Sequence, residues 1–405
     1  MNKRSSRAPR FAVTAIECYE RPVTLRLPFR FGTATVTEAP QAFVRASIHA
    51  TDGREAQGMT AELMIPKWFD KSPARSNADN IDDLRRSLAL ASAAYCANSA
   101  PRTAFGHATF HYRALLDLGA REGLNALTVS YGAALADRAI LDALCRMRDV
   151  SVGTAFWLNL PGLAADLTPD LAHFDFDAFL ATLAAPASID ARHTVGMADP
   201  LTDDEIDAAT APDDGLPVSL AAVIARYRNR WFKVKLCGDI TADVARLSAV
   251  APVLESVGAY RVTLDGNEQF PDTASLAALV GALRAEKRLG RLVEALRYIE
   301  QPFPRAIALD TDVHGLLDGM PLIIDESDAT LDAFPHARAL GYAGVSSKNC
   351  KGVYKSVLNA ARCARWNAPQ ESEPAFMTGE DLTAQPGLAV QQDLALAALL
   401  GLTHV

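Results

Sequence analysis

The pattern of apolar and polar positions changes twice along the chain. Residues 11 to 62 carry short runs rich in β-branched and other apolar residues, which is typical of β-strands. Residues 77 to 148 then carry apolar residues at helical spacing, most clearly at Asn125–Met147. Strands followed by helices predict a separate α+β domain, which we place at residues 1–150.

The pattern beyond this domain is different. Residues 151–190 are interrupted by prolines and predict an irregular connection or insertion. In residues 191–405, short apolar runs alternate with helix-like segments. The apolar runs are His193–Met197, Trp231–Leu236, Tyr260–Leu264, Tyr298–Glu300, Leu322–Ile324, Ala343–Ser347 and Ala375–Thr378, with an eighth candidate at Leu402–Val405.

Repeated strand–helix units of this size predict a parallel sheet. Seven or eight of them fit an α/β fold of the (β/α)8 type, a TIM-like barrel that ends at the eighth strand, with the first domain as an α+β cap. An open, doubly wound sheet is the competing architecture. No Gly-x-Gly-x-x-Gly follows an early strand, which weakens the dinucleotide-binding version of that alternative.

Two lysines share one face of the second run. Because side chains alternate along a strand, Lys233 and Lys235 point the same way, into a barrel interior that branched apolar residues normally fill. Neighbouring ammonium groups lower each other's pKa, which brings a lysine towards the range of a general base. An exposed strand with lysines on its wet face is the simpler explanation of this motif alone.

Carboxylates stand at the ends of the next three runs, as Asp265, Glu300 and Asp325. Three hard oxygen ligands at one barrel mouth describe a magnesium site, and no cluster of His and Cys indicates a softer metal. The sixth run ends at Lys348, which would stand across the barrel from Lys235. Taken singly, each of these residues could simply begin a surface loop.

The spacing of these residues favours a common site. Asp265 follows Lys235 by 30 residues, Glu300 follows after 35 more, Asp325 after another 25 and Lys348 after another 23. Each interval is close to one strand–helix unit. All five residues are therefore expected at the face of the barrel that carries the catalytic residues of this fold.

The composition of the 405 residues narrows the expected partners. The formal net charge of −8 argues against nucleic acid and anionic membranes. No uncharged apolar stretch reaches membrane-spanning length. The six cysteines show no metal-ligand spacing, so we expect reduced thiols in a cytoplasmic protein. A small carboxylate substrate and a homo-oligomeric assembly are the partners that we expect.

Taken together, these motifs resemble the enolase superfamily, in particular the mandelate racemase/muconate lactonizing enzyme family and its muconate-lactonizing-enzyme-like branch. The family pattern is Lys-x-Lys, Asp-x-Asn, Glu-Gln-Pro, Asp-Glu-Ser and a late lysine. It reads here as Lys233/Lys235, Asp265/Asn267, Glu300-Gln301-Pro302, Asp325-Glu326-Ser327 and Lys348. The match covers the barrel, and the first domain resembles the family's capping domain.

The resemblance implies a metal site and its surroundings. Asp265, Glu300 and Asp325 would bind Mg2+, with Mn2+ as the alternative ion. Asn267 and Glu326 would support these ligands from behind. The expected chemistry removes the proton beside a substrate carboxylate, and the metal stabilises the enediolate that results. Enolase-superfamily sites are the case that general treatments give for a lysine or histidine base working with Mg2+.

The resemblance also implies roles for the lysines. Lys235 and Lys348 would face opposite sides of the substrate α-carbon, and Lys233 would support Lys235. Two opposed bases serve racemisation or epimerisation, whereas one base with a leaving group serves cycloisomerisation or syn elimination. An acid-sugar dehydratase of the same superfamily is a second hypothesis. A barrel that binds a carboxylate or a metal without turnover is a third.

Substrate contacts are expected from two further places. Arg30 and Lys67 stand in segments that we predict to be capping loops, where either could meet a distal anion. Glu380 and Asp381 follow the seventh run, slightly before Thr383, which aligns with a glutamate of many relatives. Residues 371–387 contain no histidine, which argues against the mandelate-racemase-like branch.

Overall fold

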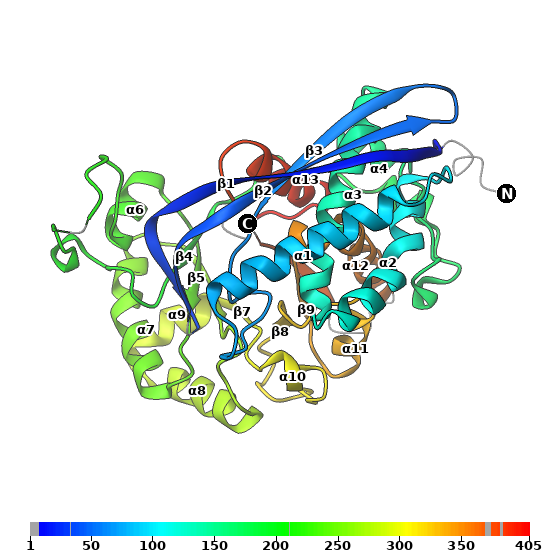
Figure 1. Ribbon diagram of the computed structural model, residues 1–405. Coiled ribbons are helices and arrows are strands. Elements are labelled where there is room, and N and C mark those ends of the chain that lie inside the picture. Colours follow the sequence, from blue (N-terminus) through cyan, green and yellow to red (C-terminus); the bar gives the residue numbers. More distant parts are fainter. Residues whose placement is uncertain (1–7, 33, 210, 369–373, 381–383) are drawn as a thin grey trace.

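The computed structural model describes residues 8–405, apart from residues 33, 210, 369–373 and 381–383. Figure 1 shows a three-stranded antiparallel sheet with helices against it and, beside this cap, a curled parallel sheet with further helices around it. The arrangement confirms the predicted fold class, a TIM-like barrel with an α+β cap. Within the described part of the chain, no helix is both long and apolar enough to cross a membrane.

The cap sheet pairs its strands in chain order: β1 (Phe11–Phe31), β2 (Ala34–Ala50) and β3 (Glu55–Leu63). Alternate side chains of β2 are buried from Val44 onwards, so one face of the sheet packs on helices. The cap helices are α1 (Asn77–Cys96), α2 (Ala104–Arg121) and α3 (Ala126–Arg148). Gly58 lets β3 approach α3 closely, because a Cβ there would lie 2.3 Å from the carbonyl oxygen of Ala139.

One prediction about the cap is wrong. The segment from Pro28 to Phe31 was expected to be a loop, but it is the end of β1, where Phe29 pairs with Val36 and Phe31 with Ala34. The resemblance to the family's capping domain implies a loop at this point. Pro28 is tolerated within β1 because β1 is an edge strand, so a missing N–H need not face a partner.

The connection at residues 151–190 contains α4 (Val152–Trp157), a 3-10 turn at Pro169–Leu171 and α5 (Phe176–Leu180). Apolar side chains of this segment, among them Phe156 and Leu180, are buried in the same hydrophobic core as the cap helices. Val357 and Leu358 of the barrel helix α12 (Val353–Asn367) belong to that core as well. The connection therefore fills the seam between the cap and the barrel.

All seven apolar runs predicted for the barrel form parallel strands, and their order in the sheet follows their order in the chain. The strands are β4 (Arg192–Val195), β5 (Trp231–Lys235), β6 (Arg261–Asp265), β7 (Leu296–Glu300), β8 (Leu322–Ile324), β9 (Gly344–Ser347) and β10 (Phe376–Gly379). A second hydrophobic core lies between this sheet and its outer helices, with Phe232, Val262 and Ile299 fully buried.

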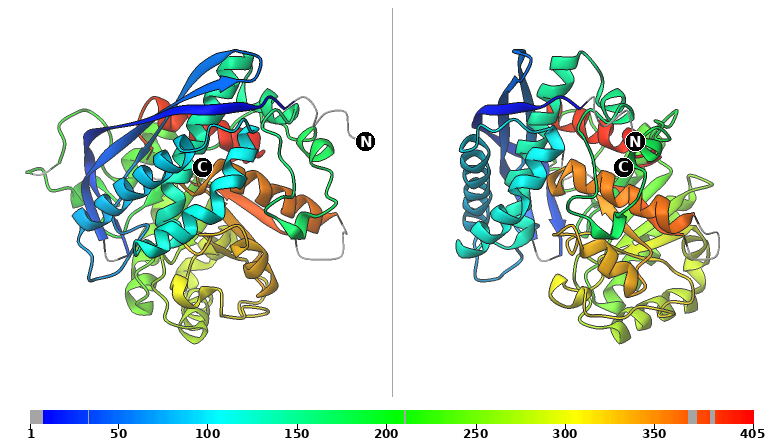
Figure 2. Two further views of the ribbon diagram at one scale, coloured as in Figure 1. Left: turned by 45° about the vertical axis from the view of Figure 1, so that its right-hand side comes forward. Right: turned by 90° about the vertical axis from the view of Figure 1, so that its right-hand side faces the viewer.

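The other barrel helices are α6 (Leu220–Tyr227), α7 (Ile240–Glu255), α8 (Thr273–Ala285), α9 (Gly290–Ala295), α10 (Arg305–Ala308), α11 (Ala333–Ala339) and α13 (Leu388–Leu399). The two views of Figure 2 show the cap sheet and cap helices, in blue and cyan, along one side of the barrel. A side-chain contact joins the two parts at β3, where the amide of Gln392 in α13 donates to the carbonyl of Met59 at 2.7 Å.

The last residues of the chain lie between β4 and β10. Asp190 and His404 form a parallel bridge, and the amide of Arg192 donates to the carbonyl of Val405 at 2.8 Å. His404 also contacts Thr378 of β10 at 3.1 Å. The eighth run thus occupies the place of the eighth barrel strand, although only an isolated bridge forms there.

Candidate active site

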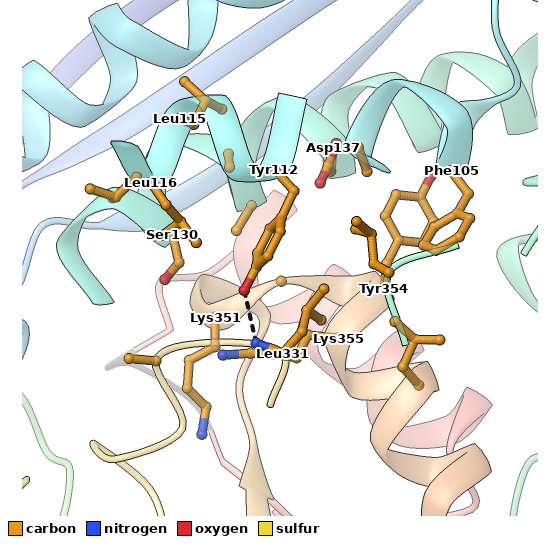
Figure 3. Close-up of a pocket in the computed structure, with 18 of the residues that line it drawn as sticks. Phe105, Tyr112, Leu115, Leu116, Ser130, Asp137, Leu331, Lys351, Tyr354 and Lys355 are labelled. Atoms are coloured by element: carbon orange, nitrogen blue, oxygen red, sulfur yellow. Dashed lines mark hydrogen bonds between the residues drawn. The ribbon is translucent and has the colours of Figure 1, made fainter. Parts of the chain in front are cut away.

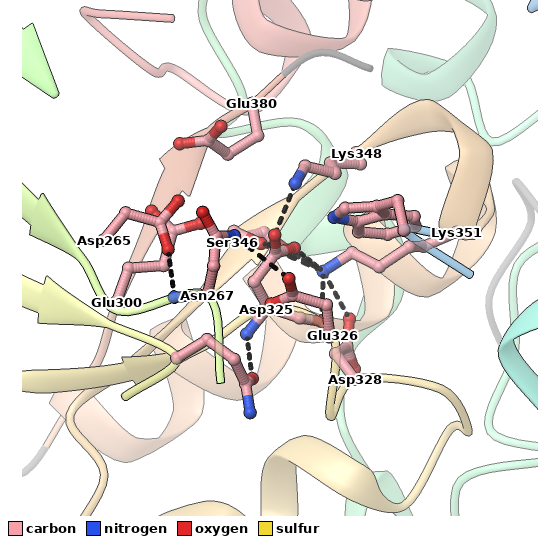
Figure 4. A network of polar contacts seen from close by, with 12 residues as sticks. Asp265, Asn267, Glu300, Asp325, Glu326, Asp328, Ser346, Lys348, Lys351 and Glu380 are labelled. Carbon is pink, nitrogen blue, oxygen red and sulfur yellow. Dashed lines mark hydrogen bonds and ion pairs between the residues drawn. The ribbon is translucent and has the colours of Figure 1, made fainter. Parts of the chain in front are cut away.

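The predicted site residues meet at the carboxyl ends of the strands, and Figure 4 shows Asp265, Glu300, Asp325 and Lys348 among them. The register places Lys235 beside Asp265, and Asp265 beside Glu300. A sharp turn follows β6, and Gly266 permits it because a Cβ there would lie 2.7 Å from the Cα of Pro302. Parallel pairing therefore brings residues far apart in the sequence into one cluster, as the spacing predicted.

Lys233 lies at the centre of this cluster. Its ammonium group is 2.8 Å from Asp265, 2.9 Å from Glu300 and 2.9 Å from Glu380, and 2% of the residue is exposed. Burial opposes its charge, but the three carboxylates outweigh burial and hold the pKa of Lys233 well above its usual value. Lys233 is therefore a fixed positive charge that organises the acidic side chains.

Lys235 has a different electrostatic environment. Its Nζ lies 2.6 Å from Oδ2 of Asp265, and the side chain is buried. Burial, together with the neighbouring charge of Lys233, lowers the pKa of Lys235, although Asp265 works in the opposite direction. The Lys-x-Lys motif was interpreted as a base with a supporting lysine, and the opposite pKa directions of the two amines agree with that division.

Lys348 approaches from the other side of the mouth, where its ammonium group contacts Asp325 (Figure 4). Burial opposes the charge, but Asp325 and the more distant Glu380 raise the pKa of Lys348 above its usual value. Asp325 also accepts a hydrogen bond from the hydroxyl of Ser346. Sequence reasoning placed Lys348 across the barrel from Lys235, and β5 and β9 are indeed separated by three strands in the sheet.

A further buried amine lies behind Asp325 and was missed. Lys351 donates to Oδ1 of Asp325 at 3.1 Å and to the carbonyl of Ser346 at 2.7 Å, and its Nζ is 3.4 Å from Asp328. Burial opposes its charge, but Asp325 and Asp328 raise the pKa of Lys351. The only signal in the sequence was a second lysine three residues beyond Lys348.

Arg192 and Gln301 were missed as well. Arg192, buried inside the barrel, contacts Glu380 and donates to the carbonyl of Gly379 at 2.8 Å. The available signal was an arginine immediately before the first apolar run. Oε1 of Gln301 accepts from the amide of Asp325 at 2.8 Å, which ties the end of β7 to the end of β8. This bond gives the middle residue of Glu-Gln-Pro a structural role.

Glu300 is the carboxylate of the predicted metal site whose pKa is raised. It is fully buried, and burial together with Glu380, Asp265 and Asp325 raises its pKa well above the usual value, although Lys233 lowers it. Carboxylates crowded in this way are stabilised by a cation. Asp265 and Asp325, by contrast, have pKa values below the usual range despite burial, because lysines pair with them.

The donor set fits a hard divalent cation. Asp265, Glu300 and Asp325 supply buried carboxylate oxygens from three successive strand ends. In the present arrangement of the described residues, ammonium groups lie between these carboxylates, and no three acidic, His or Cys side chains converge as a ready metal site. Metal binding by these residues would therefore require the lysine contacts to open.

Asn267 and Glu326 lie where the sequence predicted, next to the carboxylate cluster. The amide of Asn267 donates to Oδ1 of Asp265 at 2.9 Å, and its side chain donates to Oε1 of Glu326 at 3.1 Å. Oδ1 of Asn267 and Oε2 of Glu326 are buried polar atoms without a hydrogen bond. Lys71, from the cap, donates to Oε1 of Glu326 at 2.9 Å, so the cap contacts the residues next to the carboxylate cluster directly.

Arg305, Glu268 and Lys71 form a clamp. It holds the cap segment at residues 64–75 on the barrel mouth. Arg305 donates to the carbonyl oxygens of Trp68 and Phe69 at 2.9 and 2.7 Å and pairs with Glu268 at 2.8 Å. Lys71 lies 2.8 Å from the same carboxylate. Sequence reasoning missed these residues because their partners are distant in the chain and no motif joins them.

A cavity of about 60 Å3 lies between this cap segment and the strand ends. Cap residues Phe29, Phe31, Ile65 and Trp68 line one side, and Thr194, Lys233, Lys235, Asn267, Lys348 and Glu380 line the other. Lys235 and Lys348, the two predicted bases, therefore face the same space. Two of the other predicted contacts do not line this cavity: Arg30 is exposed, and Lys67 donates to the carbonyl of Ser72 at 2.9 Å. Asp381, like Thr383, lies outside the described residues.

A second cavity, of about 70 Å3, lies away from the strand ends, at the seam between the cap and the barrel (Figure 3). Its walls are mainly apolar, with Leu115 and Leu116 from α2. Lys351 and Lys355 approach it from the barrel side, and Asp137 points in from α3. Because it lacks the carboxylate cluster, this cavity is not the candidate active site.

Three solved structures illustrate the likeness in fold. A mandelate racemase/muconate lactonizing protein from Herpetosiphon aurantiacus is 18% identical, with 97% of this chain and 88% of that chain covered and a TM-score of 0.58. The N-succinyl Arg/Lys racemase from Bacillus cereus is 17% identical, with 97% and 86% covered and a TM-score of 0.61. The dipeptide epimerase from Enterococcus faecalis, complexed with Mg and L-Leu-L-Tyr, is 13% identical, with 97% and 89% covered and a TM-score of 0.62.

At these identities the likeness shows a shared fold. No family model matches the chain, and no curated protein sequence matches it. The residues of the site therefore carry the functional argument.

Proposed function

We propose that this protein is a Mg2+-dependent enzyme that removes the α-proton of a small carboxylate and completes an isomerase or lyase reaction of the enolase-superfamily type. The observation that carries the proposal is that two buried amines, Lys235 and Lys348, at the ends of strands separated by three others in the sheet, line one cavity next to three buried carboxylates. The comparisons add support, because the similar folds include racemases and epimerases, one of them crystallised with Mg.

The lysines divide the work of proton transfer. With the α-carbon of a substrate between them, the amine of Lys235 takes the proton from one face, and the ammonium of Lys348 returns a proton to the other. Lys233 keeps its charge, which disfavours protonation of Lys235 before the reaction and holds Asp265, Glu300 and Glu380 in place. Opposed groups of this kind fit racemisation or epimerisation most directly, and cycloisomerisation and syn elimination use one of them as the base.

The metal would be held by Asp265, Glu300 and Asp325. When bound there, Mg2+ would supply positive charge to the substrate carboxylate and so make its α-proton more acidic. Asn267 and Glu326 orient this group of ligands, since the amide of Asn267 donates to Asp265 and the Asn267 side chain donates to Glu326. The cap segment clamped by Arg305 covers the cavity and keeps bulk water from the reacting atoms.

The proposal is tested by following α-proton exchange. Proton NMR in D2O with Mg2+ is run on a panel of dipeptides, N-acyl amino acids, muconates and acid sugars. Wild-type protein is expected to introduce deuterium at the α-carbon of one class, and Lys235→Ala and Lys348→Ala are each expected to slow the reaction by at least about 100-fold. Lys287→Ala, at an exposed lysine, is the matched control.

Two results would contradict the proposal. The first is exchange that continues unchanged in Lys235→Ala, because the base would then be another group. The second is the absence of exchange with every class in a protein that binds Mg2+ by calorimetry, which would favour a barrel that binds without turnover.

A further inference from the structure

The cavity at the barrel mouth has one polar side and one apolar side. The barrel supplies the charged and hydrogen-bonding groups, whereas the cap supplies Phe29, Phe31, Ile65 and Trp68. We call these four residues the apolar wall. Phe31, Ile65 and Trp68 are each at most 4% exposed, and Phe29 is half-buried. The cap side of the cavity is therefore mainly hydrophobic.

The apolar wall is held in place from behind. The rings of Phe29 and Phe31 lie 5.5 Å apart at the end of β1, where strand pairing fixes both residues. Trp68 packs edge-on against Phe69, with 4.8 Å between ring centroids, and Arg305 holds the backbone of both residues. A surface that is ordered before a ligand arrives costs less entropy on binding.

The cations of the cap that could bind a distal anion are committed elsewhere. Lys67 donates to the carbonyl oxygens of Ser72 and Arg75 within its own segment, and Lys71 pairs with Glu326. Arg30 is exposed and does not line the cavity. Among the described residues that line the cavity, those from the cap carry no charge, and their only polar side-chain group is the indole N–H of Trp68.

Apart from the Thr194 hydroxyl, the polar groups on the barrel side are assigned to the reaction or to the carboxylate cluster. Lys235 and Lys348 flank the position of the α-carbon, while Lys233, Asn267 and Glu380 hold the carboxylate cluster. Lys348 lies 4.5 Å from the ring centroid of Trp68 and Lys235 lies 5.9 Å from that of Phe29. These contacts place both amines where the apolar wall meets the polar barrel side of the cavity.

We propose that the site takes a carboxylate whose group beyond the α-carbon is uncharged and apolar, either aromatic or branched aliphatic. This inference rests on the proposed proton abstraction and names its substrate class. A second carboxylate or a polyhydroxylated chain would lose its hydration against the apolar wall and find too few partners there. The inference therefore argues against an acid-sugar substrate.

The first experiment compares three N-acetylamino acids that differ only in the side chain on the α-carbon, with gluconate as a polyhydroxylated acid. N-acetylphenylalanine and N-acetylleucine represent the apolar class, N-acetylglutamate the anionic class and gluconate the polyhydroxylated class. The kcat/KM for deuterium exchange with Mg2+ is expected to be at least about 10-fold higher for the apolar pair. An equal or higher value for N-acetylglutamate or gluconate overturns the inference.

The second experiment changes the apolar wall. In Phe29→Arg, kcat/KM for N-acetylphenylalanine is expected to fall by about 10-fold or more and that for N-acetylglutamate to rise. Phe29 is half-buried, so the fold should tolerate the change, and circular dichroism checks this. Tyr19→Arg, at an exposed aromatic residue on the same strand, is the matched control. Unchanged values for both compounds in folded Phe29→Arg overturn the inference.

A binding measurement tests this inference separately from the proposed function, because binding does not require proton abstraction. If no compound exchanges its α-proton, proton abstraction is contradicted, and calorimetry with the same four compounds tests the apolar wall by itself. Tighter binding of the apolar pair, weakened in Phe29→Arg, supports the inference. Equal or tighter binding of gluconate or N-acetylglutamate overturns it.

Discussion

Each carboxylate of the proposed metal site faces at least one buried ammonium group. Lys233 forms ion pairs with Asp265 and Glu300. Lys348 and Lys351 both form ion pairs with Asp325. A buried ion pair adds little net stability, yet removing one partner is costly because the other charge then stays buried and uncompensated. The amines are thus as necessary to the fold of the mouth as the carboxylates are.

Lys351 allows a test of this balance, because it lies behind Asp325 and does not line the candidate active site. Lys351→Met keeps the aliphatic stem and leaves Asp325 and Asp328 with less compensation. The free energy of unfolding is expected to fall by about 3–5 kcal/mol, measured by urea denaturation. Lys287→Met, at an exposed position, controls for the loss of a lysine. A loss no larger than the control's would contradict this account.

Asp325 is one of the three proposed metal ligands, and in the structure it contacts Ser346 and two lysines. Asp325→Asn keeps the shape and removes the charge. Calorimetric titration is expected to show Mg2+ affinity weakened by more than about 100-fold, because even residues behind a metal ligand are typically worth 10- to 100-fold. Affinity equal to that of the wild type would remove Asp325 from the ligand set.

The sequence predicted the site residues that stand at the ends of successive strands, and it did not predict those at other positions. Lys235, Asp265 and Glu300 recur once per strand–helix unit, so the fold itself predicted their meeting. Lys351 and Arg192 act through partners on other strands, and no spacing rule reports such contacts.

At the scale of elements, the alternation of apolar runs and helices located every barrel strand to within a few residues. The cap was harder to predict. The length of β1 depends on its position at the edge of a sheet, which local sequence does not reveal. The attachment of the cap segment at residues 64–75 depends on Arg305, which begins α10 in the barrel more than 200 residues later.

This attachment predicts a mobility change. Arg305→Met removes the hydrogen bonds to the carbonyls of Trp68 and Phe69 and leaves Glu268 with Lys71 and the backbone amide of residue 305. Amide hydrogen exchange, followed by mass spectrometry, is expected to increase in residues 64–75, and KM is expected to rise more than kcat falls. Arg291→Met, at an exposed arginine, is the control. Unchanged protection of residues 64–75 would mean that other contacts hold the segment.

At the scale of the whole molecule, the cap and the barrel share one buried seam. Tyr95 and Asp137 come from the cap, and Tyr354 and Lys355 come from α12 of the barrel. The hydroxyl of Tyr95 donates to Asp137 at 2.6 Å, and burial raises the pKa of this carboxyl to about 7. Burial also lowers the pKa of Lys355 to about 8. Two groups that titrate near neutral pH therefore lie where the two parts meet.

Asp137 makes the stability of this seam depend on pH. Its pKa is higher in the folded protein than the value of about 3.9 in an unfolded chain, so the folded state binds the proton more tightly. The stability that this proton contributes is fully present below pH 4 and is lost as pH rises through about 7. Asp137→Asn resembles the protonated carboxyl at every pH. Urea denaturation is therefore expected to show the variant gaining about 4 kcal/mol relative to wild type between pH 4 and pH 8. Asp117→Asn, at an exposed position of α2, should show no such gain, and parallel stability curves for Asp137→Asn and wild type would mean that the seam does not hold this proton.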